Sequence, residues 1–412
     1  YVCISRPRRF GKSMAVDMLV AYYSRGCDSK KLFQNLKIAQ NETFLRYLNQ
    51  YDVISLNMQE FMSQCQSMDD MLSLLQRSVL WELLGEYPDY RYFDQNNLVR
   101  TMQDIYQNTK RPFIVIIDEW DCIFREYSNK KEDQDRYLDF LRGLLKDKEY
   151  IYLAYMTGIL PIKKYGTHSA LNMFNEFSMT NPGILAEFVG FTEQEVEKLC
   201  QKYNRNLEEL KEWYDGYHFG DFDVYCPWDV MNYLLELQHN PQAKPVSYWK
   251  NTSDNAIIRS FIDHSGSSIT KKLENLMAGE TIVQRVDENL TYDYLHSSED
   301  NLWSMLYLTG YLTKARNEQT DEVLPDGAIA LMIPNEEIRD IFETTVIQWF
   351  DDSTRKWNRT LLFDAVWNGD SVNLTKEMNI LLRRTISYHD YKEDFYHAFL
   401  AGIFTGAGYM VD

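Results

Sequence analysis

The stretch "SRPRRFGKSM", residues 5–14, decides the fold. It ends in Gly11-Lys12-Ser13, the last residues of a phosphate-binding loop, and it stands between an apolar run at 1–5 and a helical stretch at 12–24. In such a loop the backbone amides and the helix dipole face the phosphates, the Lys ammonium contacts the terminal phosphates, and the Ser hydroxyl binds Mg²⁺. We expect Gly11 to lie where the backbone approaches the phosphate most closely.

Arg6 occupies the position where such a loop normally has its first glycine. That glycine often relieves a tight demand on φ and ψ, so its replacement leaves two interpretations open. In one, Arg6, Arg8 and Arg9 surround a phosphate site and one of them adds positive charge there, with Arg9 as the candidate contact. In the other, the stretch is a basic turn that starts a helix, and the arginines face solvent or an acidic second domain.

A second element lies about 105 residues downstream, where the apolar run Ile114–Ile117 ends in Asp118-Glu119. Such a run is typical of a strand buried on both faces of a parallel sheet. An ATPase needs an acid at the end of a neighbouring strand to hold Mg²⁺ through water, and a base to orient the attacking water. Asp118 and Glu119 are the candidates for these two roles. The alternative is a buried strand that happens to end in solvated acids.

Thr157 is a third element, because it follows another apolar run at 151–156. A polar side chain at the end of such a strand can sense the γ-phosphate, although a simple strand-end hydroxyl would give the same pattern. The three elements together favour a nucleotide site over a chance match.

The order of the expected elements predicts a doubly wound parallel α/β sheet over about 1–185. Strands are expected at 1–5, 52–57, 112–117 and 151–156, and helices at 12–24, 66–84, 97–107 and 132–147. After Gly190 the pattern is mainly helical, beginning with a capping box at Thr192 and Glu195. The aromatic segment 213–220 is expected to form a packed turn between two helices, and short strands are expected near 281–286 and 329–333.

The composition is that of a globular protein of 412 residues, 45% hydrophobic and 25% charged. The net charge of −18 argues against non-specific binding of nucleic acid by the whole surface. Six cysteines stand singly without a CxxC pair, so we expect reduced thiols in a cytoplasmic protein. No apolar run reaches about 18 residues, which predicts no membrane span. Because Tyr1 falls within an apparent strand, we expect the chain to be a fragment.

A set of motifs in fixed order adds a resemblance. They are "RPRRFGKS", "IIDEWD", "YMTGI", "GFTEQEV", "LKEWYDGYHFG", "VYCPWDVMNYL", "LWSMLYLTGYL" and "IPNEEIRDIF". This set resembles the AAA-ATPase-like family of bacterial proteins, which often carry a C-terminal PD-(D/E)xK nuclease domain. The resemblance implies a P-loop ATPase in which Arg6 is the family pattern. It also implies that Lys12, Ser13, Asp118 and Glu119 form the nucleotide and Mg²⁺ set. Asp121 lies in the same motif, with no role assigned beyond a surface or supporting acid.

Four segments are expected from the motifs. Residues 1–188 would form the α/β P-loop ATPase domain, 189–310 a helical domain, and 311–385 a winged-helix-like region. Residues 386–412 would begin a truncated nuclease domain, in which Glu393 is a candidate supporting acid. The core acid and the E-x-K pair of such a nuclease would lie on later strands, after Asp412. Glu209-Leu210-Lys211 has the E-x-K spacing but stands in an acidic helix with no strand acid before it, so we expect no DNA cleavage by that mechanism.

The site residues expected from these arguments fall into three roles. Glu119, Lys12 and Thr157 are the catalytic candidates. The nucleotide contacts are Arg8, Arg9, Phe10, Gly11, Lys12, Ser13 and Met14, and the metal ligands are Ser13 and Asp118. The cofactors would be ATP, by the family's preference, and Mg²⁺. The expected partners are a nucleotide, DNA through the missing nuclease domain, and further copies of the chain in a homo-oligomer, with no membrane partner.

The sequence therefore predicts an ATP-hydrolysing module that acts as a switch or motor for an attached nuclease. Two alternatives stay open at this stage. One is a nucleotide-dependent regulatory module with negligible hydrolysis. The other is a scaffold in which the Gly-Lys-Ser sequence binds nothing.

Overall fold

A computed structural model describes residues 1–127, 130–162, 171–249, 258, 267–287, 298–316, 324–356 and 360–385. The expected nuclease segment 386–412, with Glu393, lies outside the described residues. The chain divides into two compact units. The first unit comprises Tyr1–Leu207, Tyr217–Met231 and Val286–Gly310, and the second comprises Glu208–Gly216, Asn232–Arg285 and Tyr311–Asp412. The four segments expected from the sequence stay a prediction.

The first unit is built on a five-stranded sheet of β1 (Val2–Ser5), β2 (Asp52–Asn57), β3 (Phe113–Asp118), β4 (Ile151–Gly158) and β5 (Asn175–Phe177). The strand order is β2-β3-β4-β1-β5, and every neighbouring pair is parallel. The predicted parallel α/β sheet is therefore confirmed. One detail of the prediction is wrong, because β4 lies between β1 and β3, so the Asp118 strand does not neighbour the strand before the loop.

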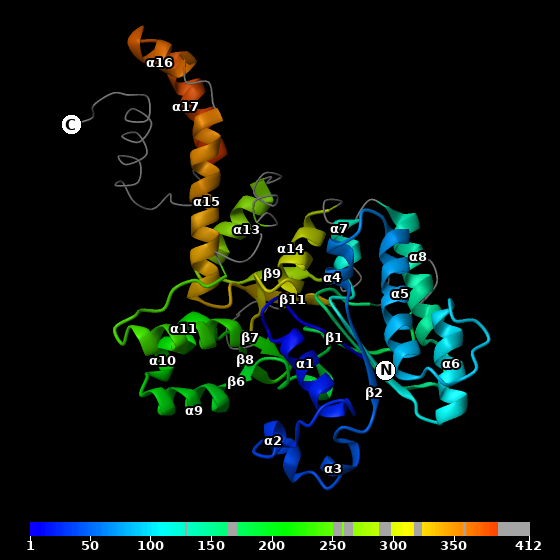
Figure 1. Cartoon of the computed structure of the whole chain (residues 1–412). Helices are drawn as coiled ribbons and strands as arrows, with labels where there is room; N and C mark the ends of the chain where they lie inside the picture. Colours follow the sequence, from blue (N-terminus) through cyan, green and yellow to red (C-terminus); the bar gives the residue numbers. More distant parts are fainter. Residues whose placement is uncertain are drawn as a thin grey trace. The chain divides into compact units, whose positions relative to one another are not determined.

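Helices cover both faces of this sheet (Figure 1). On one face Val16 of α1 (Lys12–Tyr23) packs in a core with Ile4, Ile114 and Ile116. Alternation along β3, whose six residues are all buried, turns Val115 and Ile117 to the opposite face. The helices α5 (Met68–Glu86), α6 (Leu98–Thr109) and α8 (Lys131–Leu145) pack together there, close to the ranges expected from apolar periodicity.

Shorter elements complete the first unit. They are α2 (Lys30–Phe33), η1 (Lys37–Gln40), α3 (Phe44–Tyr47), α4 (Met58–Ser63), α7 (Cys122–Glu126), η2 (Gly183–Leu185), β6 (Phe191–Thr192), α9 (Glu193–Tyr203), β7 (Tyr217–Phe219), β8 (Phe222–Tyr225) and α14 (Glu299–Leu308). Thr192 begins α9 with the expected capping box, in which the Glu195 carboxylate accepts from the Thr192 amide at 3.0 Å. Strands β6, β8 and β7 form a small antiparallel sheet.

The second unit is mainly helical, as expected. Its helices are α13 (Ser267–Met277), α15 (Glu336–Lys356), α16 (Thr360–Trp367) and α17 (Ser371–Thr385), while α10 (Leu207–Tyr214) and α11 (Pro227–His239) cross the division between units. Strands β9 (Ile282–Arg285), β10 (Thr313–Lys314) and β11 (Ala328–Met332) form an antiparallel sheet in the order β10-β11-β9. The strands near 281–286 and 329–333 are confirmed. The winged-helix-like segment stays a prediction, and β9 pairs with it from outside 311–385.

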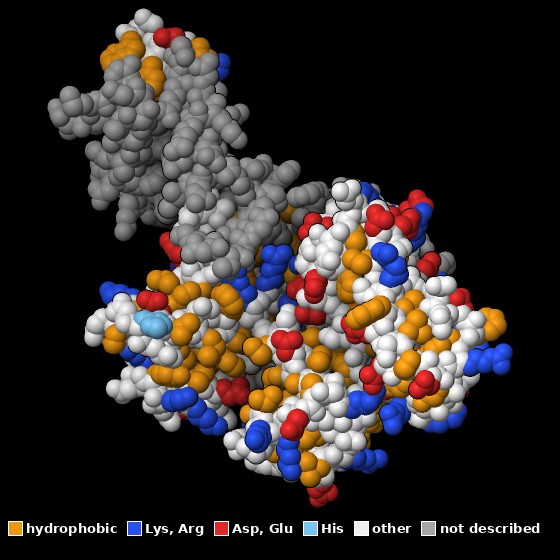
Figure 2. All heavy atoms as spheres, viewed as in Figure 1, with side chains coloured by type: hydrophobic (Ala, Val, Ile, Leu, Met, Phe, Trp, Pro, Cys, Tyr) orange, Lys and Arg blue, Asp and Glu red, His pale blue; other side chains and the backbone are white. Residues whose placement is uncertain are grey.

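The visible surface of the first unit mixes charges of both signs. Figure 2 shows acidic and basic side chains interspersed over it. Within the described ranges, no helix has both the length and the apolar composition needed to cross a bilayer.

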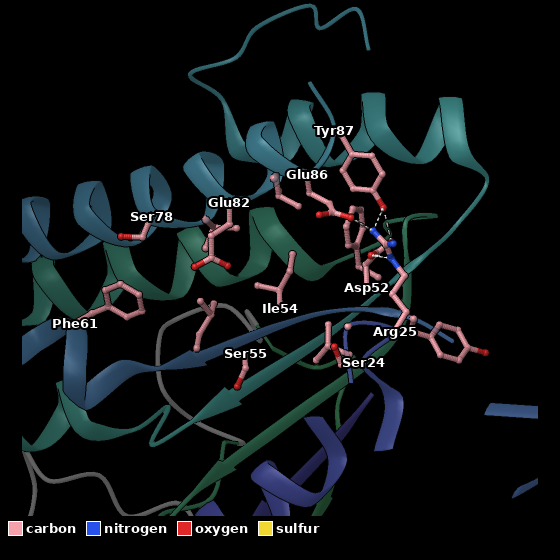
Figure 3. Close-up of a pocket in the computed structure, with 17 residues that line it drawn as sticks. Ser24, Arg25, Asp52, Ile54, Ser55, Phe61, Ser78, Glu82, Glu86 and Tyr87 are labelled. Atoms are coloured by element: carbon pink, nitrogen blue, oxygen red, sulfur yellow. Dashed lines mark hydrogen bonds and ion pairs between the residues drawn. The ribbon is translucent and has the colours of Figure 1, made fainter. Parts of the chain in front are cut away.

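A cavity of about 330 Å³ lies between edge strand β2 and helix α5, and a polar network closes one end of it (Figure 3). Arg25, two residues after α1, pairs with Asp52 at the start of β2 and with Glu86 at the end of α5, the latter at 2.5 Å. The Tyr87 hydroxyl donates to the second Asp52 oxygen at 2.6 Å. This network ties three elements of the α/β layer together at the edge away from the phosphate-binding loop.

We predict that Asp52→Ala lowers the free energy of unfolding by about 1–3 kcal/mol, because Arg25 and Tyr87 both lose a charged partner. The matched control is Asp139→Ala on α8, which removes an exposed pair with Arg142 at 2.7 Å and should cost about 0–1 kcal/mol. Urea unfolding of both variants measures the difference. Equal unfolding midpoints for the two variants would show that the Arg25 network stabilises the fold no more than an exposed ion pair does.

Candidate functional site

The loop at residues 6–11 joins the end of β1 to the first residue of α1, as expected. Gly11 caps the helix with φ of +85°, a left-handed conformation that favours glycine, and no atom lies within 4 Å of where a Cβ would stand. The first amides of any helix lack acceptors within the helix, and α1 has no acidic residue in its first turn. The helix N-terminus therefore presents amide donors and the positive end of its dipole beside open space, which suits an anion.

The Lys12 side chain is buried, with 5% of its surface exposed. Its ammonium donates to the carbonyl oxygens of Arg6 at 3.2 Å and Pro7 at 2.9 Å. The side chain therefore connects the end of the loop to its beginning. Burial lowers the pKa of Lys12, and the carboxylates of Glu119, Asp121 and Asp118 oppose that shift. An anion placed beside Lys12 would favour the charged form further.

The Asp118 carboxylate gathers residues from three parts of the chain. It is 3% exposed, and its Oδ2 accepts from the Ser13 hydroxyl at 2.6 Å. Its Oδ1 accepts from the Thr157 hydroxyl at 2.8 Å and from the Glu119 amide at 3.0 Å. The structure thus brings Ser13 and Thr157 each into direct contact with Asp118, although β4 lies between β3, which ends at Asp118, and β1, which precedes the loop.

Glu119 follows Asp118 with φ of +52°, a left-handed conformation that is uncommon for a residue other than glycine. Its carboxylate accepts from the Arg125 guanidinium of α7 at 2.8 Å, and Arg125 also donates to Gln59 at 3.3 Å. These side chains line an open cleft of about 480 Å³ with Ser13. The residues around the cleft are Ser13, Asn57, Gln59, Glu60, Ser63, Glu119 and Arg125.

Arg6 does not contribute to a phosphate site, which corrects one expectation. Its guanidinium is fully buried and donates to the carbonyl oxygens of Ser5, Phe177 and Leu185 at 3.1–3.3 Å. It also lies over the Phe219 ring, 4.5 Å from the centroid. Burial lowers the pKa of Arg6 to about 10, so the side chain stays a cation at neutral pH. Arg6 anchors the start of the loop to β5 and η2 instead.

The Phe10 side chain is also buried, and the expected contact of this residue with a nucleotide stays a prediction. It packs edge-to-face on Tyr217 at 4.8 Å and on Phe219 at 5.5 Å, both on β7. The segment 213–220 is therefore not a simple turn between helices, because it contains this strand of the β7–β8 hairpin. The Phe10 amide remains part of the loop.

The other expected loop contacts keep exposed surface. Met14 on α1 is 64% exposed, and Arg8 is partly exposed. Arg9 has φ of +71°, its carbonyl accepts from the Cys226 thiol at 3.5 Å, and its guanidinium lies 6.0 Å from the Trp228 ring. Contact of these three residues with a nucleotide stays a prediction.

Of the two alternatives for Asp121, a surface acid or a supporting acid, its burial excludes the surface one. Asp121 is fully buried, and its Oδ2 accepts from the amides of Ile159 and Leu160, both at 3.0 Å. Burial raises the pKa of Asp121. The carboxylate joins the turn after β3 to the segment after β4, so it holds the Glu119 and Thr157 chain segments together. A second bond does the same, since the Trp120 amide donates to the Thr157 carbonyl at 3.0 Å.

Gly158 is the residue that permits this close packing. A Cβ at this position would lie 2.5 Å from Trp120 Nε1 and 2.8 Å from Asp121 Oδ1. Gly158 stands within the motif "YMTGI" and Arg125 lies four residues after "IIDEWD", whereas Gln59 belongs to no quoted motif. Their contacts depend on how separate chain segments meet.

We predict that Gly158→Ala destabilises the fold by more than about 3 kcal/mol, because a buried Trp120 must move. Gly143→Ala on α8 is the control, since nothing lies within 4 Å of an added Cβ there. It should stabilise the protein by about 0.5–1 kcal/mol through its higher helix propensity. Thermal unfolding compares the two, and a Gly158→Ala protein as stable as wild type would contradict the packing described.

The loop, the parallel sheet and the strand-end acids define an α/β P-loop NTPase fold, followed by a helical region. Residues 1–167 match the family model described as AAA-ATPase_like, "Predicted AAA-ATPase". The resemblance to the AAA-ATPase-like family is therefore confirmed over residues 1–167.

One curated relative is 21% identical over 343 residues. It is described as "Uncharacterized protein in vnfD 5'region" of Azotobacter chroococcum mcd 1. The match covers 82% of this chain and 61% of that protein, so the chain spans about three fifths of the relative's length.

Two solved structures are distantly similar. Cdc6p from Pyrobaculum aerophilum is 9% identical, with coverage of 85% of this chain and 88% of that one and a TM-score of 0.30. The Aeropyrum pernix Orc1 protein, solved in complex with DNA, is 11% identical, with coverage of 84% and 85% and a TM-score of 0.28. Both TM-scores indicate only a distant likeness of fold.

Proposed function

We propose that the first unit binds Mg-ATP at the N-terminus of α1 and hydrolyses it. The observation that carries this proposal is the 2.6 Å contact between the Ser13 hydroxyl and the Asp118 carboxylate, beside the Gly11 amide and the buried Lys12 ammonium. A chance Gly-Lys-Ser sequence gives no reason for an acid 105 residues away to bond its serine. The amides of the helix N-terminus would cradle the phosphates, with Lys12 on the terminal ones.

The oxygen atoms at this position suit Mg²⁺. A hydroxyl and a carboxylate are hard ligands, and Mg²⁺ in nucleotide sites takes one or two protein oxygens with waters and phosphates completing an octahedron. No cluster of three or more His, Cys, Asp or Glu side chains occurs in the described residues, and this kind of site needs none. Ser13 and Asp118 would hold the ion, which when bound neutralises phosphate charge.

The remaining side chains have roles in the hydrolysis step. Glu119 would orient a water and accept its proton. Thr157, held by Asp118, would report the presence of the γ-phosphate. Lys12 would stabilise negative charge on the transferred group. The nucleotide would also contact Arg8, Arg9, Gly11 and Met14.

A second candidate function is a nucleotide-dependent regulatory module with negligible hydrolysis. The observation that favours it is the 2.8 Å ion pair of Glu119 with Arg125, because a carboxylate that is already engaged is a poor base. Attachment to a nuclease domain, contact with DNA through it, assembly of several copies and a cytoplasmic location are finer proposals. The resemblance drawn from the motifs supports the nuclease attachment and, through it, the DNA contact.

We expect Lys12→Ala to abolish the rise in melting temperature that Mg-ATP produces in the wild type, because the terminal phosphates lose their buried cation. Thermal shift with and without Mg-ATP makes the measurement, and circular dichroism checks the fold. Lys198→Ala, an exposed lysine of α9, is the control and should respond like wild type. A wild type without any Mg-ATP response would leave the scaffold interpretation standing.

The two candidate functions separate at Glu119→Gln. If the chain hydrolyses ATP, phosphate release should fall about 100-fold or more while nucleotide binding persists, because a general base contributes about 10²–10⁴-fold. Release of inorganic phosphate under saturating Mg-ATP measures it. Equally low release from wild type and variant, with binding intact, would select the regulatory module.

A further inference from the structure

The cleft beside Ser13 has an uneven distribution of charge. Of the seven described residues that line it, Arg125 is the one cation, and it faces Glu119 and Glu60 among polar neighbours. Arg125 comes from α7, only five residues long, which the chain forms directly after the Asp118–Asp121 turn. The Arg125 side chain is 14% exposed and the Glu119 side chain 22%, and both line the cleft.

Arg125 bridges two side chains that line the cleft. One guanidinium nitrogen serves both Glu119 at 2.8 Å and Gln59 at 3.3 Å. Arg125 also lies within electrostatic reach of Lys12, since its charge contributes to lowering the pKa of that lysine. An anion that reaches both Ser13 and Lys12 therefore enters the field of Arg125 as well.

We propose that Arg125 is the triphosphate-sensing residue of this site. In the structure it holds the Glu119 carboxylate. A terminal phosphate beside Ser13 attracts the same guanidinium, because a phosphate carries more charge than a carboxylate and arginine binds it through several donors. Arg125 then leaves Glu119 free to accept a proton from water, so hydrolysis starts only when the third phosphate is in place. This inference rests on the proposed function and assigns its regulation.

The energetic consequence is a preference for triphosphate over diphosphate. A diphosphate reaches the loop and Lys12 but does not extend to Arg125, so the ion pair persists. A bound triphosphate replaces the Glu119 carboxylate with its terminal phosphate as the partner of Arg125. The affinity for triphosphate therefore includes the free-energy difference between these two ion pairs. Removal of Glu119 as a partner therefore tightens triphosphate binding, whereas removal of Arg125 weakens it.

The experiment measures dissociation constants of Mg-β,γ-imido-ATP, which resists hydrolysis, and of Mg-ADP by isothermal titration calorimetry on the whole chain. We expect Arg125→Gln to weaken the triphosphate analogue about tenfold, the size of one charge-assisted hydrogen bond, and to leave ADP within about twofold. We expect Glu119→Gln alone to tighten binding of the triphosphate analogue several-fold. The same substitution should leave the dissociation constant unchanged when it is added to Arg125→Gln. Arg136→Gln on α8 is the matched control. It removes exposed ion pairs with Asp69 of α5 and Glu132 of α8 and should change neither dissociation constant.

Three results would overturn the assignment. They are equal weakening of both nucleotides by Arg125→Gln, an unchanged triphosphate affinity, and a Glu119→Gln effect that persists without Arg125. Should Arg125→Gln not fold, Glu119→Gln alone decides, because its triphosphate affinity must exceed that of wild type. The failure of this inference is distinct from failure of the proposed function. In the first case the nucleotides still bind and Lys12→Ala still abolishes binding, and in the second no nucleotide binds at all.

Discussion

The buried Asp118 carboxylate is the constraint on which the rest of the site depends. An ionised side chain that is 3% exposed is costly unless hydrogen bonds satisfy its oxygens. Here both oxygens are satisfied by groups from three chain segments, the Ser13 hydroxyl, the Thr157 hydroxyl and the Glu119 amide. The same bonds that make the carboxylate tolerable therefore fix the ends of β3 and β4 against the start of α1. The hydrogen bonds to the Asp118 carboxylate therefore determine both the geometry of the site and the stability of this part of the sheet.

A second layer of contacts keeps those segments in register. The Asp121 carboxylate accepts hydrogen bonds from two backbone amides of the segment after β4, and the Trp120 amide donates to the Thr157 carbonyl. Gly158 lets the indole and the carboxylate approach the backbone, since any Cβ would occupy their place. The left-handed backbone of Glu119 is held between these contacts and the Asp118 carboxylate. The unusual conformation is thus maintained by its neighbours on both sides, which is how strained residues persist in folded proteins.

Much of the sheet was predictable because its strands obey simple patterns. Fully apolar runs such as Ile114–Ile117 indicate strands buried on both faces, and helix periods are readable when one face is apolar. Convergence of Ser13, Asp118 and Thr157 was also predictable, since all follow from parallel strands that end at one edge. The strand order was not, because sequence order does not say that β4 inserts between β1 and β3. The roles of Arg125 and Gln59 escaped prediction as well, because Arg125 meets Glu119 and Gln59 only through tertiary packing.

Arg6 shows how a loop can do without its usual first glycine. Its side chain turns away from the phosphate position and bonds three carbonyl groups, while Phe219 covers its guanidinium. Phe10, at the other end of the loop, packs on the same β7 strand. Both ends of the loop are therefore held by residues 217–219, about fifty positions beyond the part of the chain that matches the family model. A fragment that ended at residue 167 would expose Phe10 and strip the Arg6 guanidinium of its Phe177 and Leu185 acceptors as well as its aromatic cover. The loop conformation is consequently a property of the whole first unit and not of the strand–loop–helix sequence by itself.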